Sequence, residues 1–352
     1  MPPLEEARRP MATLSRRALL AAAPAATLAA CQPAMRTTVS TTPKLDIEGM
    51  NRAIARLAGP RGVGALGVGL ANLESGESYT FNGERRFPMQ SVFKALLGAY
   101  ALSEAEAGRI RLTDTFDLDK QDLSAPWSPI GAAWPARRTF TTDELLAAAV
   151  VDSDNTAADV LMKRIGGPGA LSAWLEAKHI PEVRVDRYER EIQPEAHGMA
   201  SFRPEWRTDA GFSAAEAAVP AAARAAALRN YMSDPRDTAT PTGMLEFLKK
   251  LDASELTGQA STRRLVTLMS QTPRAGNRIR AGLPKDAFLA HKPGTAGVVD
   301  GVSSAHNDVG VFRLADRRSY AICVFVSGST LDEAGRDRVI ADATRAAVRA
   351  VG

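Results

Sequence analysis

Ser91-Val92-Phe93-Lys94 is the stretch that decides how this 352-residue sequence is interpreted. Phe87-Pro88-Met89-Gln90 precedes it, and the helical run Ala95-Leu96-Leu97-Gly98-Ala99-Tyr100 follows. A serine at a helix start presents its hydroxyl beside free backbone N–H groups, and a lysine one turn on lies on the same face. Taken alone, the pattern also suits a helix-capping serine and a solvated lysine, so the rest of the chain must decide.

Three further polar clusters follow in a fixed order. Ser153-Asp154-Asn155 comes after an apolar run at 145–151, Glu189 lies within Asp186-Arg187-Tyr188-Glu189-Arg190-Glu191, and Lys292-Pro293-Gly294-Thr295 comes last. Alone, the first suits a capping loop and the second a solvated charged face. Together, the four clusters supply a nucleophile, a proton shuttle, a general base and a cationic anchor. Acyl transfer from a small anionic amide requires this set of groups.

This order of motifs resembles the class A serine β-lactamases, with their Ser-x-x-Lys, Ser-Asp-Asn and Lys-Thr-Gly motifs. The resemblance runs from about Leu45 to Gly352. It implies an α+β fold of two lobes, in which an antiparallel sheet flanked by the terminal helices packs against an all-α lobe. The active site is expected in the crevice between the lobes.

The resemblance also implies a role for each motif residue. Ser91 is the nucleophile with Lys94 as its partner, and Ser153 delivers a proton to the leaving nitrogen. Asn155 holds the side-chain amide of the substrate and helps to position Lys94. Glu189, 34 residues further on (189 minus 155), activates the water that hydrolyses the acyl-enzyme. Whether Glu189 or Lys94 is also the acylation base stays open.

Further positions carry substrate-binding roles by the same resemblance. Lys292 binds the substrate carboxylate, and Thr295 donates its backbone N–H, with that of Ser91, to the developing oxyanion. Arg278 aligns with a carboxylate-binding arginine of some relatives, although a solvated arginine suits the position nearly as well. Trp127 matches an aromatic residue that walls the pocket entrance, with structural packing as the other interpretation.

Two substitutions depart from the family pattern inside the site. Pro293 replaces the hydroxyl residue usual between the lysine and the glycine, which removes one carboxylate-binding group and one backbone donor. Thr295 is the residue placed to compensate. Gln193 stands where the family carries an asparagine that helps to hold the deacylating water, and its extra methylene is expected to slow deacylation.

The largest departure is a long insertion at 193–234, which is rich in Ala, Pro and Arg and only weakly periodic. In the resemblance, Arg187 and Asp237 pair to close the loop that carries Glu189. Here they are 50 residues apart (237 minus 187). We predict that the insertion leaves and returns so that this pair still meets. Whether it serves as a lid, a partner surface or a spacer is open.

Hydrophobic periodicity gives the order of the remaining elements. It predicts helix over 45–57, strands over 64–73 and 77–81, a helical block, strands over 287–292, 308–314 and 319–327, and a terminal helix over 331–351. We therefore expect one catalytic domain over 45–352. Its α/β lobe comprises 45–90 and 252–352, and its helical lobe comprises 91–251.

The first 30 residues are expected to form an export signal of a lipoprotein. Ser15-Arg16-Arg17 begins a twin-arginine motif, and Leu28-Ala29-Ala30-Cys31 resembles a lipoprotein box with Cys31 as the acylated residue. The apolar run between them is too short to span a membrane. Residues 31–44 then form a tether. We expect an exported, periplasmic or cell-envelope lipoprotein that a lipid on Cys31 attaches to the membrane, with a plain Sec signal as the alternative.

The composition limits the classes of partner and cofactor that the chain is expected to bind. The formal charge of +4 falls to +2 without the surplus of two in the leader, and the basic residues are scattered, so no nucleic-acid partner is expected. The four histidines form no metal-binding pattern, and neither a metal nor a cofactor is expected. Cys323, within an apolar run, is predicted to be a buried thiol. A monomer is expected.

The sequence thus predicts a hydrolase that opens β-lactams through an acyl-enzyme on Ser91. A slowly deacylating penicillin-binding protein or peptidase is the first alternative, favoured by Gln193 and the insertion and opposed by Glu189. A noncatalytic envelope lipoprotein that keeps the fold as a binding module is an alternative of another class. A serine glutaminase is a more remote one.

Overall fold

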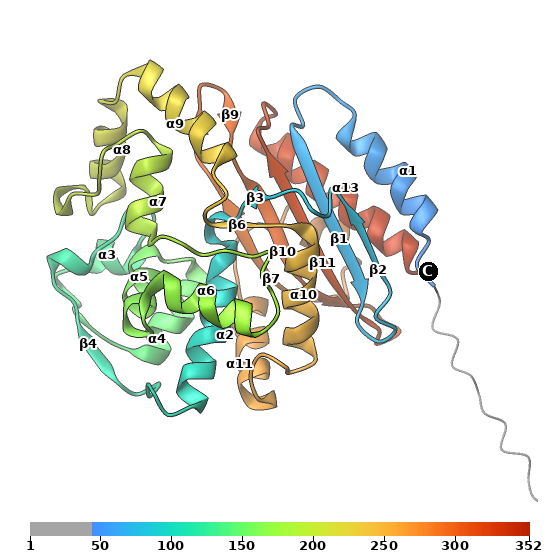
Figure 1. Cartoon of the computed structure of the whole chain (residues 1–352), viewed down its shortest axis with the longest axis horizontal. Helices are drawn as coiled ribbons and strands as arrows, with labels where there is room; N and C mark the ends of the chain where they lie inside the picture. Colours follow the sequence, from blue (N-terminus) through green and yellow to red (C-terminus); the bar gives the residue numbers. More distant parts are fainter. Residues whose placement is uncertain (1–43) are drawn as a thin grey trace, which may run out of the picture. The chain divides into compact units, whose positions relative to one another are not determined.

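A five-stranded antiparallel sheet organises residues 44–352, the part of the chain that the computed structural model describes (Figure 1). Its order is β2-β1-β11-β10-β7, so the first and last strands in the sequence pair, with Ala65 opposite Ser327. The predicted signal, Cys31 and the tether up to residue 43 lie outside the described residues. The strands are β1 (Ala65–Asn72), β2 (Ser78–Phe81), β7 (Phe288–Thr295), β10 (His306–Arg313) and β11 (Ser319–Ser327).

Helices cover both faces of this sheet. The terminal helices α1 (Ile47–Ala58) and α13 (Glu333–Ala350) pack together on one face, where Met50 and Ile340 join a buried apolar layer. Strands buried on both faces are continuously apolar, as the run around Cys323 in β11 shows. Cys323 is a buried free thiol, as predicted, and burial raises its pKa. The α+β fold with a sheet flanked by terminal helices is confirmed.

The helix α10 (Pro241–Asp252) corrects the predicted division into lobes. The sequence placed it in the helical lobe, but it packs against β1 and β11 on the second face of the sheet (Figure 1). Gly69 in β1 explains how it fits, because a Cβ at that position would lie 2.8 Å from Leu245. The helix α11 (Gln259–Ser270) then packs beside β7. The lobe that contains the sheet therefore includes α10, which begins at Pro241, before the predicted boundary at 252.

The helical lobe is built around α2 (Phe93–Glu106), which is buried along almost its whole length. The π-helical turn η3 (Ala148–Asp152) and the helices α5 (Asn155–Arg164) and α6 (Gly167–Ala177) surround it. The smaller elements are η1 (Gln90–Val92), η2 (Lys120–Asp122), α3 (Pro129–Ala133), α4 (Thr142–Ala147), α12 (Ile279–Gly282) and the strand pairs β3 (Phe87–Pro88) with β6 (Thr238–Ala239), β4 (Thr115–Asp117) with β5 (Thr139–Thr141), and β8 (Val298–Val299) with β9 (Val302–Ser303).

The insertion is helical and its base is closed. It holds the 3₁₀ turn η4 (Pro204–Trp206) and the helices α8 (Asp209–Ala217) and α9 (Ala221–Ser233). The preceding helix α7 (Glu189–Ala196) runs through Gln193, so the excursion begins at His197, four residues later than predicted. Arg187 Nε donates to Asp237 Oδ2 at 2.6 Å, which confirms that the two ends meet.

Within residues 44–352, the helices are either too short or too polar to cross a bilayer.

Candidate active site

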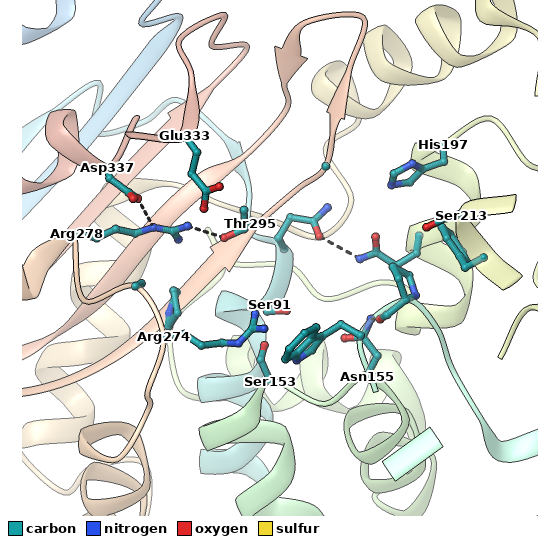
Figure 2. A pocket seen from close by; sticks show the side chains of 18 of the residues that line it. Ser91, Ser153, Asn155, His197, Ser213, Arg274, Arg278, Thr295, Glu333 and Asp337 are labelled. Carbon is teal, nitrogen blue, oxygen red and sulfur yellow. Dashed lines mark hydrogen bonds and ion pairs between the residues drawn. The ribbon is translucent and has the colours of Figure 1, made fainter. Parts of the chain in front are cut away.

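Ser91 and Lys94 lie where the 3₁₀ turn η1 passes into α2. Ser91 is at the centre of the site (Figure 2). Lys94 Nζ donates to Ser91 Oγ at 3.1 Å and to the carbonyl oxygen of Ser153 at 2.8 Å. It also donates to Asn155 Oδ1. The lysine is fully buried, so these oxygens replace the water that would otherwise solvate its amine.

Glu189 supplies a fourth oxygen to the same amine. Its Oε1 lies 3.0 Å from Lys94 Nζ, and both side chains are buried. An ammonium has only three protons to donate, and the first three partners already take them. Accordingly, Oε1 receives no aligned hydrogen bond from any group in the described chain. Glu189 is held by charge, and one of its oxygens keeps its capacity to accept a proton.

Ser153 accepts hydrogen bonds from two buried lysines, Lys94 and Lys292. It has a left-handed backbone (φ 62°) at the end of η3, which turns its carbonyl toward Lys94. Its Oγ accepts a hydrogen bond of 3.0 Å from Lys292 Nζ. Burial, together with the neighbouring Lys94 cation, lowers the pKa of Lys292 well below its usual value. Lys292 is fully buried behind Ser153 and does not line the cavity in which a substrate would bind.

Asp154, to which the sequence assigned no role, fixes the loop between these groups. Its carboxylate accepts from the N–H groups of Ala157 (2.8 Å) and Ile130 (2.7 Å) and from Ser128 Oγ (2.9 Å). Burial raises the pKa of this carboxyl group, against the opposing effect of its donors. The contacts to 128 and 130 tie the Ser-Asp-Asn loop to the loop that carries Trp127.

Asp159 holds Glu189 in place and was also missed. Its two oxygens accept from the N–H groups of Glu189 (2.7 Å) and Arg190 (3.0 Å), and Ser124 Oγ donates to it at 2.7 Å. Burial raises the pKa of Asp159 to about 7. One signal was available in the sequence, because Asp159 follows Asn155 by four residues and so shares its face of α5.

A chain of amides connects Glu189 to the insertion. Gln193 Nε2 donates to Glu189 Oε2 at 2.8 Å and lies 3.0 Å from Gln90 Oε1. Gln90 Nε2 in turn donates to the hydroxyl of Tyr231, a buried residue of α9, at 2.7 Å. Gln193 therefore occupies one oxygen of Glu189 directly. No sequence pattern pointed to Gln90 or Tyr231, since this contact joins residues 141 positions apart.

The cavity beside Ser91 has a volume of about 610 Å³ and two dissimilar ends. Figure 2 shows Arg278 and Asp337 on one side of Ser91, and His197 and Ser213 of the insertion on the other. Asn155, Gln193, Trp127 and Thr295 also line it, as their predicted substrate-binding roles require. The insertion is therefore part of the pocket wall.

The first end is rich in guanidinium groups. Arg278 donates to Asp337 Oδ1 at 3.0 Å and to Thr295 Oγ1 at 2.8 Å, which fixes it at the pocket. Arg274, four residues earlier in the same loop and not predicted, lies with its guanidinium 3.5 Å from the centre of the Trp127 ring. Burial and the nearby Arg278 lower the pKa of Arg274. Trp127, 41% exposed, thus forms the pocket rim together with Arg274.

The edge strand β7 explains how Pro293 is tolerated. The sequence predicted that this strand ends at 292, but it continues to Thr295. Ala296 N–H donates to the carbonyl of Ala305, so the alternation of an antiparallel ladder turns the backbone nitrogens of 293 and 295 away from β10. Proline therefore breaks no ladder bond. The N–H of Thr295 points outward from the sheet, as an oxyanion donor requires.

A serine hydroxyl contacting a buried lysine, with a second serine and a carboxylate on the same amine, defines a serine enzyme of the acyl-transfer type on a two-lobed fold. Residues 50–351 match the Beta-lactamase enzyme family, and the chain belongs to that family as a class A member.

Its relatives carry the same family name. The chain is 30% identical to the carbapenem-hydrolyzing β-lactamase KPC of Klebsiella oxytoca, over 82% of this chain and 85% of that protein. It is 28% identical to β-lactamase VEB-1 of Pseudomonas aeruginosa, over 79% and 82%. Among solved structures, a β-lactamase from Chitinophaga pinensis superposes with a TM-score of 0.69 at 28% identity, over 84% of this chain and 97% of that one. The class A enzyme of the last common ancestor of Gram-negative bacteria gives 0.70 at 30%, over 86% and 100%.

Proposed function

We propose that this β-lactamase opens its substrate through an ester on Ser91 and then hydrolyses that ester with water activated by Glu189. The observation that carries the proposal is the position of Lys94 Nζ, buried 3.1 Å from Ser91 Oγ and 3.0 Å from Glu189 Oε1. One amine thus touches the nucleophile of the first step and the base of the second.

In the first step, Ser91 Oγ adds to the lactam carbonyl carbon. Lys94 Nζ takes the proton of Ser91 as it passes one of its own to Glu189 Oε1, 3.0 Å away. The carbonyl oxygen becomes an oxyanion and accepts from the N–H groups of Ser91 and Thr295. The C–N bond then breaks, and the nitrogen takes the proton of Ser153 Oγ. Lys292, whose lowered pKa loosens its proton, lies 3.0 Å away and replaces the one that Ser153 gave up.

Before the second step, Glu189 gives up the proton that it took in the first, and this proton replaces the one that Lys292 lost. In the second step, Glu189 Oε1 takes a proton from water, and the hydroxide attacks the ester carbonyl carbon. The ester C–O bond breaks and Glu189 passes the proton from water to Ser91 Oγ, so the enzyme is restored. The free oxygen of Glu189 suits this role because it accepts no hydrogen bond from the described residues. Asp159 holds the backbone of Glu189 by the N–H contact at 2.7 Å.

One contact favours the slowly deacylating alternative. Gln193 Nε2 bonds Glu189 Oε2 at 2.8 Å and so draws electron density from the carboxylate that must act as a base. A weaker base would remove the water proton more slowly. The two functions differ only in the lifetime of the ester, and one experiment separates them.

That experiment is intact-mass spectrometry of the purified domain at successive times after mixing with excess benzylpenicillin. Hydrolysis predicts a transient adduct that decays while the drug disappears, and a persistent adduct in Glu189→Gln. A wild-type adduct that lasts for hours would mean a penicillin-binding protein. If Ser91→Ala forms the same adduct as the wild type, the assignment of the nucleophile is wrong, and no adduct with no drug loss would leave a binding module.

We further propose export through the twin-arginine route, lipid attachment at Cys31 and a monomeric state. The motif Ser15-Arg16-Arg17 and the box Leu28-Ala29-Ala30-Cys31 support the first two. In cells, the protein should partition into the membrane fraction, and Cys31→Ser should release it. A soluble wild type would contradict the lipid anchor. Sedimentation of the domain tests the monomer.

A further inference from the structure

The insertion contributes its own set of side chains to the pocket. His197, Phe212, Ser213 and Glu216 line the same cavity as Ser91. In Figure 2, His197 and Ser213 lie on the opposite side of Ser91 from Arg278 and Asp337. The cavity therefore extends from the nucleophile in two directions, and the second direction exists because the insertion walls it.

This wall is anchored to both rims of the cavity. On one side, Asp209 in α8 accepts a hydrogen bond from the N–H of Trp127. On the other, the His197 ring lies against Gly297, where a Cβ would come within 3.3 Å of its Cε1. Beneath them, Phe212 packs edge-on against His197 with ring centres 5.7 Å apart, in an apolar cluster with Ala125. A wall tied at three points presents its polar groups in fixed positions.

Glu216 places a negative charge on this wall. His197 Nδ1 lies 2.7 Å from Glu216 Oε1, so the imidazole donates to one carboxylate oxygen. The side chain of Glu216 is 28% exposed, and in residues 44–352 no lysine or arginine forms an ion pair with it. Its second oxygen has no hydrogen-bond partner within that part of the chain. A carboxylate oxygen at a pocket surface attracts cationic donors and repels anions.

The chemistry of the substrate decides which of its parts reaches this wall. A bicyclic β-lactam carries its carboxylate on the ring fused through the lactam nitrogen. It carries its acylamino group on the carbon at the other side of the carbonyl. The two substituents therefore project away from the reacting carbon in opposite directions. With the carboxylate drawn to Arg274 and Arg278, the acylamino side chain extends past Asn155 toward the insertion.

We propose that the insertion forms a subsite for the acyl side chain, and that Glu216 makes it favour cationic side chains over anionic ones. This inference rests on the proposed hydrolysis of β-lactams and adds the substrate class. His197 is a positioning residue that orients the carboxylate. The long insertion thereby acts as a specificity element instead of a spacer.

Three penicillins with the same bicyclic nucleus test this subsite. Ampicillin has an ammonium on its side chain, benzylpenicillin is uncharged there, and carbenicillin has a carboxylate. The readout is kcat/KM for each, measured with the purified mature chain. We expect Glu216→Gln to lower the ratio of ampicillin to carbenicillin about fivefold or more, since one charge acts on two opposite charges. Glu216→Lys should lower it further, in favour of carbenicillin.

The matched control is Glu205→Gln, in η4 of the same insertion. The side chain of Glu205 lies 3.7 Å from Lys120 and does not line the cavity. The ratio of ampicillin to carbenicillin in this variant should therefore equal that of the wild type. A low ratio in both Glu216 variants with an unchanged control supports the subsite. An unchanged ratio in both variants, with benzylpenicillin still hydrolysed, overturns the subsite alone. A wild type that hydrolyses none of the three overturns the proposed function and, with it, the subsite.

Discussion

The floor of the pocket and the wall made by the insertion are built on opposite principles. The floor buries charge, since Lys94, Glu189 and Lys292 are each 1% exposed or less and lie among fixed hydrogen-bond partners. The wall buries apolar side chains, and the one carboxylate that it presents to the cavity, that of Glu216, is partly exposed. A buried charge must be paired or bonded, whereas a rim charge keeps much of its water.

The difference separates chemistry from recognition. The groups that we propose to exchange protons lie on the floor, where low polarity strengthens each electrostatic contact. Groups that would meet the variable part of a substrate lie on the wall, where substitution leaves the floor intact. The two regions meet at a few contacts, among them the buried hydrogen bond between Gln90 and Tyr231.

The most severe way to break the floor is Lys94→Ala. It removes the amine shared by Ser91 and Glu189 and leaves the partly buried hydroxyl and the buried carboxylate without their partner. We expect kcat/KM for benzylpenicillin to fall roughly 10³-fold. Lys120→Ala, on the exposed turn η2, is the control and should stay within twofold of the wild type. A loss smaller than tenfold at position 94 would contradict the role of Lys94 in both steps.

Breaking the junction between floor and wall should reduce stability. Asp237→Ala leaves Arg187 buried without its closest partner, which costs about 3 kcal/mol of the free energy of unfolding. Urea denaturation measures this loss. Arg184→Ala removes the partly exposed pair with Asp186 and should cost no more than about 1 kcal/mol. Equal losses in the two variants would show that the buried pair does not close the loop.

The charge on Asp159 should make the floor sensitive to pH. Burial raises the pKa of Asp159 to about 7 in the folded chain, against an ordinary value of about 3.9. Folding therefore favours the protonated form, and this contribution is fully present below about pH 4 and lost as pH rises through about 7. In urea, the stability of wild type relative to Asp159→Asn should fall by roughly 1–3 kcal/mol from pH 5 to pH 8.

The exposed Asp117→Asn variant serves as the reference for that titration, because its stability should follow the wild type at both pH values. Parallel pH profiles for wild type and Asp159→Asn would refute the raised pKa.

The smallest expected effect sharpens the comparison instead of breaking it. Tyr231→Phe removes the hydroxyl that holds Gln90 Nε2, and so loosens the support of Gln193 and Glu189. We expect deacylation to slow about fivefold, near the worth of one buried hydrogen bond. In stopped-flow mixing, more acyl-enzyme should accumulate and kcat and KM should fall together. Tyr100→Phe loses a similar bond to the carbonyl of Ile165, far from Gln90, and should leave deacylation unchanged.

Short-range patterns predicted much of this molecule. Apolar runs near both ends of the chain predicted the strands of the sheet, and the resemblance at Arg187 and Asp237 predicted that the insertion closes. The motifs of Ser91 and Ser153 lie at element boundaries, where backbone geometry is set locally, and the fold brings both residues to Lys94. Their chemical roles stay proposals.

What the sequence did not predict depends on packing between distant segments. The helix α10 belongs with the sheet because Gly69 leaves room for Leu245, and nothing local to either residue shows that. Arg274 reaches Trp127 across a separation of 147 residues (274 minus 127). The weakly periodic insertion folds on a small apolar cluster around Phe212, and its pattern is faint because Phe212 is the one buried residue of α8.

The ion pair between Arg187 and Asp237 makes the segment between them replaceable. Because its ends are held together whatever lies between, the entropy of closing the loop changes by only about 0.6 kcal/mol for each doubling of length. Segments of other lengths and compositions could then be grafted at this base to present new surfaces to Ser91. Substrate preference could thus be changed by replacing the insertion, without any substitution among the buried residues around Ser91.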